Sequence, residues 1–90
     1  MAIKNKKKIL ITGVAGFIGF SLARSLIKSK NYYVVGIDNL NTYYTKKLKV
    51  KRLDLLKNKN FKFYKIDLLE KDKIHNLFKK HKFNTVFNFA

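Results

Sequence analysis

Short runs of apolar residues recur four times along the chain, and each has the features of a β-strand. Residues 9–12 and 33–38 are continuous apolar runs rich in β-branched side chains, which is typical of strands buried on both faces of a sheet. Residues 61–66 instead alternate apolar residues with lysines, a period of two that predicts a strand nearer the sheet edge. Residues 85–89 form the fourth run, directly before Ala90.

Between these strands, apolar residues recur at steps of three and four, which is the pattern of a helix with one buried face. The spacing predicts helices over residues 17–29 and 47–56. A third helix is expected to carry Ile74, Leu77 and Phe78 on its buried face.

Strands that alternate with helices in this way indicate βαβ units around a parallel sheet. We predict an α/β fold of the Rossmann type, a doubly wound parallel sheet with four strands, three helices and strand order 3-2-1-4. This order leaves the fourth strand as an exposed apolar edge. Because natural proteins rarely leave such an edge unprotected, further chain or a partner chain is expected to cover it.

Composition narrows the class of protein. The 90 residues allow one small domain with a modest core. The absence of cysteine excludes a disulfide framework and favours a reducing, cytoplasmic compartment. Residues 9–23 form an apolar stretch behind a lysine cluster, but its regularly spaced glycines and Arg24 argue against a secretory signal, and it is shorter than the ~20 residues that span a bilayer. No membrane association is predicted.

The chain carries a formal net charge of +16. The lysine and aromatic residues at 61–65 leave open a polyanion-binding module. The lysines favour no segment, however, so we interpret them as a general compositional bias and predict no specific nucleic-acid partner. His75 and His81 have no third ligand at a suitable spacing, so we expect both to be solvated and predict no metal site.

The main candidate site is a glycine-rich turn between the first strand and the first helix. Gly13 allows a sharp turn off the strand, Gly16 allows a pyrophosphate to approach the backbone, and Gly19 allows the helix to pack close to the sheet. The N–H groups at the helix start and the helix dipole favour phosphate there. The alternative is a purely structural glycine turn.

Asp38 ends the second strand, about 20 residues after Gly19, where dinucleotide-binding folds place an acid against ribose. Its carboxylate can accept hydrogen bonds from the adenosine 2′- and 3′-hydroxyls and repels a 2′-phosphate. This predicts NAD rather than NADP, although Lys46 and Lys47 nearby temper the exclusion of NADP. The alternative is that Asp38 only caps the next turn.

Asp67 has a similar place at the end of the third strand. Its carboxylate could meet the exocyclic amine of adenine. It also stands three residues before Glu70, a spacing that predicts a capping pair for the third helix. Both interpretations stay open, since one carboxylate can serve both.

Three segments together resemble the extended short-chain dehydrogenase/reductases, the NAD-dependent epimerase/dehydratase family that acts on nucleotide sugars. They are residues 12–19 (Thr-Gly-x-x-Gly-Phe-Ile-Gly), 35–41 (Val-Gly-Ile-Asp-Asn-Leu-Asn) and 64–68 (Tyr-Lys-Ile-Asp-Leu). Residues 16–20 and 38–44 are most similar to UDP-glucuronate 4-epimerases and related capsule-sugar epimerases. The resemblance implies that residues 1–90 are the N-terminal part of an NAD-binding Rossmann domain, whose remainder, with the substrate-binding region, is absent.

The resemblance also implies the roles of individual residues. The backbone of Phe17 and Ile18 would contact pyrophosphate, Asp38, Asn39 and Asn41 would hold the adenosine ribose and its surroundings, and Asp67 and Leu68 would flank adenine. Phe89 and Ala90 would approach the cofactor from the end of the fourth strand. Asn88 occupies a position often held by His, and this makes the position uninformative.

The family reaction is a transient oxidation at C4 of the sugar followed by reduction from the opposite face, with NAD as the hydride carrier. The resemblance implies a nucleotide-sugar substrate and a homodimer for the full-length protein. No catalytic Ser or Thr, Tyr and Lys are identified in this chain. Tyr43 and Lys47 fit Tyr-x-x-x-Lys, but they follow the second strand, at the adenosine end, so we assign them no catalytic role.

The sequence leaves two other interpretations of the function open. A nucleotide-sugar 4,6-dehydratase or a decarboxylase would use the same scaffold. A non-catalytic NAD-binding or polyanion-binding module is the alternative of another class.

Overall fold

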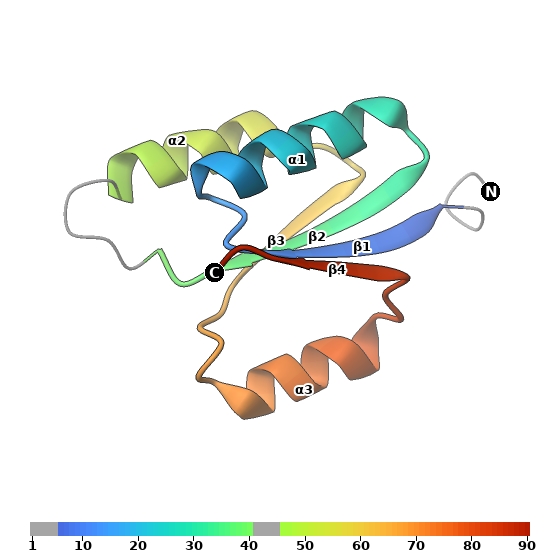
Figure 1. Cartoon of the computed structure of the whole chain (residues 1–90), viewed down its shortest axis with the longest axis vertical. Coiled ribbons are helices and arrows are strands. Elements are labelled where there is room, and N and C mark those ends of the chain that lie inside the picture. Colours follow the sequence, from blue (N-terminus) through green and yellow to red (C-terminus); the bar gives the residue numbers. More distant parts are fainter. Residues whose placement is uncertain (1–5, 41–45) are drawn as a thin grey trace.

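A computed structural model of the chain describes residues 6–40 and 46–90. These residues form seven elements in strict alternation, shown in Figure 1: β1 (Lys7–Thr12), α1 (Phe17–Ser29), β2 (Tyr32–Asp38), α2 (Lys46–Leu56), β3 (Phe61–Lys65), α3 (Lys71–Lys80) and β4 (Thr85–Asn88). The predicted elements are therefore all present, with bounds that differ by one or two residues.

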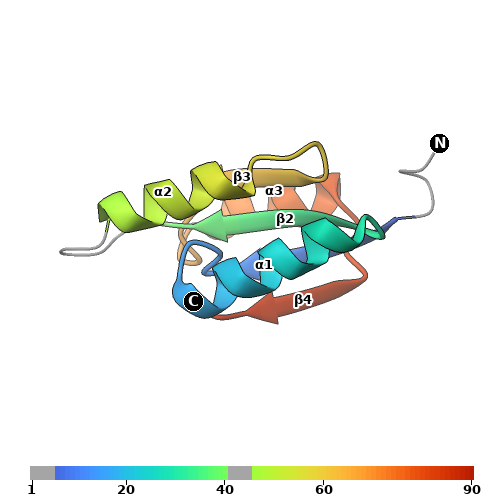
Figure 2. The same cartoon turned by 90° about the horizontal axis from the view of Figure 1, so that it is seen from above.

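The four strands make one parallel sheet in the order β3-β2-β1-β4, which confirms the predicted order. Helices α1 and α2 cover one face of the sheet and α3 covers the other (Figure 1). Seen from above in Figure 2, α1 and α2 lie side by side over the sheet. Cover on both faces explains the apolar runs within β1 and β2: side chains on either side of the sheet are buried over residues 9–12 and 34–38.

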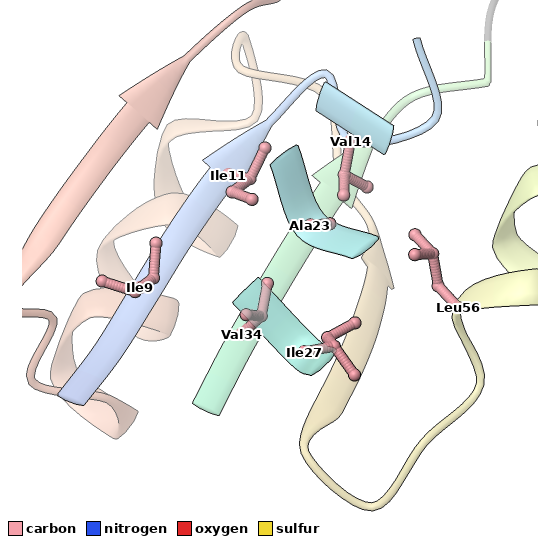
Figure 3. Packing of buried hydrophobic residues seen from close by; sticks show 7 residues of the cluster. All are labelled: Ile9, Ile11, Val14, Ala23, Ile27, Val34 and Leu56. Atoms are coloured by element: carbon pink, nitrogen blue, oxygen red, sulfur yellow. The ribbon is translucent and has the colours of Figure 1, made fainter. Parts of the chain in front are cut away.

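Each face of the sheet has its own apolar core. On the α1 and α2 side, Ile9, Ile11 and Val34 pack with Ala23 and Ile27 of α1, as Figure 3 shows. On the other face a second cluster contains Leu10, Val35, Ile37, Ile66 and Leu77. Successive residues of β1 thus serve opposite cores, as the period of two along a strand requires.

The outer strands differ from the central pair. The side chains of β3 are half-buried or exposed, in agreement with the edge position that its alternating lysines predict. In the described chain β4 pairs with β1 alone, and Val86 is 46% exposed. The exposed apolar edge predicted for the fourth strand is therefore present.

The start of α3 corrects one expectation. The helix begins at Lys71 with Glu70 as its N-cap, and no side chain caps it. The Asp67 N–H donates to Glu70 Oε1 at 2.9 Å, and the Leu69 N–H donates to Asp67 Oδ1 at 2.9 Å. The two acids therefore order the turn that precedes α3 and do not cap the helix, because the turn continues to residue 70 before the helix begins. The Asp67 N–H, and secondarily Lys73, lowers the pKa of Glu70.

His81 corrects a second expectation. His75 is exposed as predicted, whereas His81, directly after α3, is only 7% exposed. Its ring packs against the rings of Tyr33, Tyr64 and Phe83, at centroid distances of 6.5, 6.1 and 5.6 Å. The end of α3 turns this side chain toward the sheet, and a helical pattern that stops at residue 80 carries no signal for that.

The surroundings of His81 favour the neutral imidazole. Burial, and then the positive charges of Lys8 and Lys80, lowers the pKa of His81. The Tyr64 hydroxyl lies 3.3 Å from Nε2, while the buried Nδ1 has no hydrogen-bond partner among the described residues. A second ring proton would therefore find no acceptor at Nδ1, which agrees with the direction of the pKa shift.

None of the helices within residues 6–40 and 46–90 combines the length and the apolar character needed to cross a membrane.

Burial of His81 predicts a pH-dependent stability. Its pKa in the folded chain lies below the unfolded value near 6.5, so the unfolded state binds the proton more tightly. The contribution of neutral His81 to the free energy of unfolding is therefore present above pH 6.5. It is lost as the pH falls through the pKa of His81 in the folded chain. The urea midpoint of the chain should therefore decrease between about pH 7 and pH 5, a window above the range in which Glu70 titrates.

His81→Phe should flatten this part of the pH profile, while the same substitution at the exposed His75 should leave the decrease unchanged. Circular dichroism during urea titration at each pH measures both. An unchanged slope in the His81 variant would contradict the assignment.

Candidate functional site

The turn that joins β1 to α1 lies at the carboxyl edge of the sheet. Parallel register brings Thr12 opposite Ile37 of β2 and Asn88 of β4, so these three strands end together. Crevices at this edge are where open α/β sheets bind ligands. Figure 1 shows the C-terminal end of the chain beside the same turn.

Hydrogen bonds to the end of β2 hold the turn. The N–H groups of Gly13 and Val14 both donate to the Ile37 carbonyl, at 2.9 and 3.2 Å. The Ala15 N–H donates to Asp38 Oδ2 at 3.0 Å, and the Gly16 N–H donates to the Gly13 carbonyl at 3.0 Å. Every amide from residue 13 to 16 is thus used within the protein.

The free donors lie one step further along the chain. The first helical hydrogen bond of α1 runs from the Phe20 N–H to the Gly16 carbonyl. The N–H groups of Phe17, Ile18 and Gly19 therefore have no partner among the described residues, as at the start of any helix. Two of these three amides, those of Phe17 and Ile18, belong to residues that the resemblance assigns to pyrophosphate.

Two of the glycines are required sterically. Gly13 has φ +71°, and a Cβ there would lie 2.9 Å from the Phe89 carbonyl carbon. A Cβ at Gly19 would overlap the Gly13 carbonyl oxygen. Gly19 thus lets the helix approach the turn itself, whereas the prediction placed this contact at the sheet. At Gly16 the nearest atom to such a Cβ is the Gly13 carbonyl oxygen at 3.2 Å, so sterics alone place a milder demand there.

Asp38 occupies the centre of the hydrogen-bond network. Its side chain is 3% exposed, and beyond the bond from Ala15 its Oδ1 accepts from the Leu40 N–H at 2.8 Å. Lys49 Nζ lies 3.3 Å from the same oxygen. The carboxylate therefore orders the following turn, as one sequence interpretation holds, and also ties the glycine turn to β2.

Lys49 and Arg52 of α2 were not predicted as site residues. Arg52 Nη1 donates to the Ala15 carbonyl at 3.0 Å, and its guanidinium lies 6.0 Å from the Phe17 ring centroid. The lysines expected to temper the charge of Asp38, Lys46 and Lys47, are exposed instead. Lys49 and Arg52 stand three residues apart, hence on one side of the helix. That spacing, together with a nearby buried acid, is the signal that could have found them.

The ends of β2 and β3 are bridged by polar side chains. Asn39 Nδ2 donates to Asp67 Oδ2 at 3.3 Å, while Asp67 Oδ1 accepts the Leu69 N–H. Asp67 is therefore a turn-ordering residue, and it also faces the same pocket as Asp38.

The end of β4 is attached to β1. The Phe89 N–H donates to the Thr12 carbonyl at 3.0 Å. Asn88 Oδ1 accepts from the Thr12 hydroxyl and from the Ala90 N–H, the latter at 3.3 Å. Asn88, a position that was uninformative in the sequence, thus fixes the backbone of residues 89–90 beside the glycine turn.

These segments enclose a pocket of about 410 Å³, within the range of small-molecule sites. The predicted residues that line it are Gly13, Gly16, Asp38, Asn39, Asp67, Leu68, Phe89 and Ala90. Residues that line it without having been predicted are Thr12, Ile37, Lys49 and Ile66.

The predicted residues Phe17, Ile18 and Gly19 are described but are not part of the lining. The side chains of Phe17 and Ile18 are exposed, and their backbone N–H groups lie at the start of α1. Gly19 is buried in α1. Asn41 and Tyr43 lie outside the described residues.

A glycine turn at the carboxyl edge of a parallel sheet ordered 3-2-1-4, with an acid ending the second strand, defines a Rossmann-type nucleotide-binding fold. The model of the GDP-mannose 4,6 dehydratase family matches residues 10–90, and the chain belongs to this family. This confirms the resemblance to nucleotide-sugar epimerases and dehydratases.

Individual proteins show the same relationship. The UDP-glucuronate 4-epimerase of Thermodesulfobacterium geofontis is 42% identical over 82 residues, which are 90% of this chain and 25% of that protein. The dTDP-D-glucose 4,6-dehydratase of Dictyostelium discoideum is 42% identical over 86 residues, 93% of this chain and 19% of that protein.

A solved structure is similar over most of the chain. It is that of a UDP-glucuronic acid 4-epimerase variant from Bacillus cereus in complex with UDP-4-deoxy-4-fluoro-glucuronic acid and NAD. The TM-score is 0.79 at 38% identity, covering 92% of this chain and 26% of that chain. The chain thus spans about a quarter of the length of such relatives.

The steric demands of the turn predict unequal costs for two alanine substitutions. Gly13→Ala combines a positive φ with overlap against the Phe89 backbone, and should lower the free energy of unfolding by about 2 kcal/mol or more. Gly16→Ala, at φ −74°, should cost clearly less. Urea denaturation of both variants tests this; a loss for Gly13→Ala that does not exceed the loss for Gly16→Ala would contradict the prediction.

Proposed function

We propose that residues 1–90 form the NAD-binding portion of a nucleotide-sugar epimerase similar to UDP-glucuronate 4-epimerases. The observation that carries the proposal is the pocket itself, in which the glycine turn and the Asp38 carboxylate share one wall. Family membership supports an epimerase or a dehydratase. NAD in the complex of the Bacillus cereus epimerase supports the cofactor.

The unpaired amides fit the diphosphate of such a cofactor. Phe17, Ile18 and Gly19 present their N–H groups at the positive end of the α1 dipole, where negative groups are favoured. The side chains of the first turn carry no acid that would repel a phosphate. These residues would bind the diphosphate through the backbone and need no dedicated lysine.

Asp38 and its neighbours fit the adenosine end. Asp38 would accept hydrogen bonds from ribose hydroxyls, with Asn39 beside it, while Asp67 and Leu68 would flank adenine on the β3 side. Phe89 and Ala90 line the pocket next to Gly13. Asn41 is included in the proposed ribose surroundings on the family resemblance alone.

When bound, NAD supplies a hydride acceptor and donor for transient oxidation of the sugar at C4. The residues of this chain would hold and orient the adenosine half of the cofactor. For the full-length protein we propose a nucleotide-sugar substrate and a homodimer. A 4,6-dehydratase is the second candidate, supported by the family match and the Dictyostelium relative.

Calorimetry with NAD and NADP tests the cofactor assignment. The chain should bind NAD more tightly than NADP, and Asp38→Asn should weaken NAD binding by about tenfold or more, because charge-assisted hydrogen bonds are each worth roughly 1.5–3 kcal/mol. Asp54→Asn, at an exposed acid on α2, is the matched control and should leave the affinity unchanged. Circular dichroism verifies that each variant is folded. Tighter binding of NADP by the unmodified chain would overturn the assignment.

A further inference from the structure

A second pocket lies at the amino edge of the sheet, at the end of the strands opposite to the glycine turn. Figure 1 shows that the parallel strands begin on this side. The residue before β1, the end of α1 and the loop before β3 line the pocket, which has a volume of about 680 Å³. Four of the residues that line it are lysines, namely Lys6, Lys28, Lys30 and Lys59.

The four pocket lysines have no counter-charge. All five acids of the chain lie within the described residues, and their ion pairs are with Lys49, Lys57 and Lys73. No described acid lines the pocket. Lysines that are spread evenly along the sequence are thus gathered by the fold around one space, where their like charges repel one another.

Asn60 adds a buried polar side chain to the same pocket. It is 3% exposed, and its carbonyl accepts the Val34 N–H at 2.9 Å, which fixes it to the start of β2. Its Oδ1 accepts from Lys6 Nζ, so one of the four ammonium groups is held against the pocket wall. Its side-chain Nδ2 has no hydrogen-bond partner among the described residues, and the pocket therefore has an amide donor beside the ammonium groups.

The end of α1 explains only part of this cluster. Cations are favoured at the C-terminal end of a helix, and Lys28 and Lys30 lie there. Lys30 is nevertheless the C-cap with φ 65°, a left-handed conformation that favours glycine. Lys6 and Lys59 come from other segments, so the dipole of α1 does not account for their place in the same pocket.

We propose that the pocket at the amino edge binds an oligophosphate, that is, a compact anion with several negative charges. Ammonium groups are common ligands of phosphate, and an anion with a single charge would leave most of the four uncompensated. Phosphate oxygens accept hydrogen bonds from several donors at once, which matches four ammonium groups and one amide. The volume is within the range of small-molecule sites. This site is independent of the proposed NAD binding at the opposite edge.

Calorimetry with inorganic tripolyphosphate at low salt, on the full 90-residue chain, tests the proposal. Lys28→Gln together with Lys59→Gln removes two exposed lysines from different segments, and should weaken binding by about tenfold or more, because charge-assisted contacts are lost. Lys51→Gln together with Lys71→Gln removes the same charge at exposed positions outside the pocket. This control should weaken binding by less than about twofold, because solvent and salt screen distant charges.

Amide chemical shifts measured by NMR on the unmodified chain locate the ligand. Tripolyphosphate should shift the signals of residues 27–30 and 58–60 and leave those of residues 17–19 unchanged. Shifts confined to residues 17–19 would place the anion at the glycine turn and overturn the proposal. Absence of binding to the folded chain, or equal weakening in the two double variants, would also overturn it. Because this measurement needs no substitution, it decides the case even if circular dichroism shows that a variant is unfolded.

Discussion

The glycine turn has its shape because the end of β2 accepts its amides. The Ile37 carbonyl receives two N–H groups and the Asp38 carboxylate receives a third, while Arg52 holds the Ala15 carbonyl from α2. With the turn satisfied internally, the only unpaired amides of this segment are those of the first turn of α1. The same hydrogen bonds that stabilise the turn therefore determine which backbone N–H groups are left without a partner among the described residues.

Much of this arrangement could be predicted because it depends on short stretches of sequence. A strand that is buried on both faces is apolar throughout, so β1 and β2 were identifiable. In a parallel sheet the residue that follows such a strand lies at the carboxyl edge, which places Gly13 and Asp38 together without knowledge of the remaining contacts. Gly13 could likewise be predicted from the local sequence, because it has a positive φ that few other residues adopt without strain.

The residues that could not be predicted depend on how helices are rotated against the sheet. Lys49 and Arg52 reach the turn because α2 presents that side inward, yet α2 is lysine-rich around most of its circumference and has no strong apolar stripe to define its orientation. His81 follows α3 and is buried by three aromatic rings from distant segments. Tertiary packing determines such positions, and the local pattern of apolar and polar residues does not predict them.

Acidic residues are rare in this strongly basic chain, and two of them lie in the same pocket. Only 5 of 90 residues are acidic against 21 lysines and arginines, yet Asp38 and Asp67 both face one pocket. Burying Asp38 is favourable only because backbone N–H groups and Lys49 replace its water. On a surface of such positive potential a diphosphate is attracted without a dedicated cation. The acids add what that potential cannot, namely hydrogen-bond acceptors at fixed positions in the pocket.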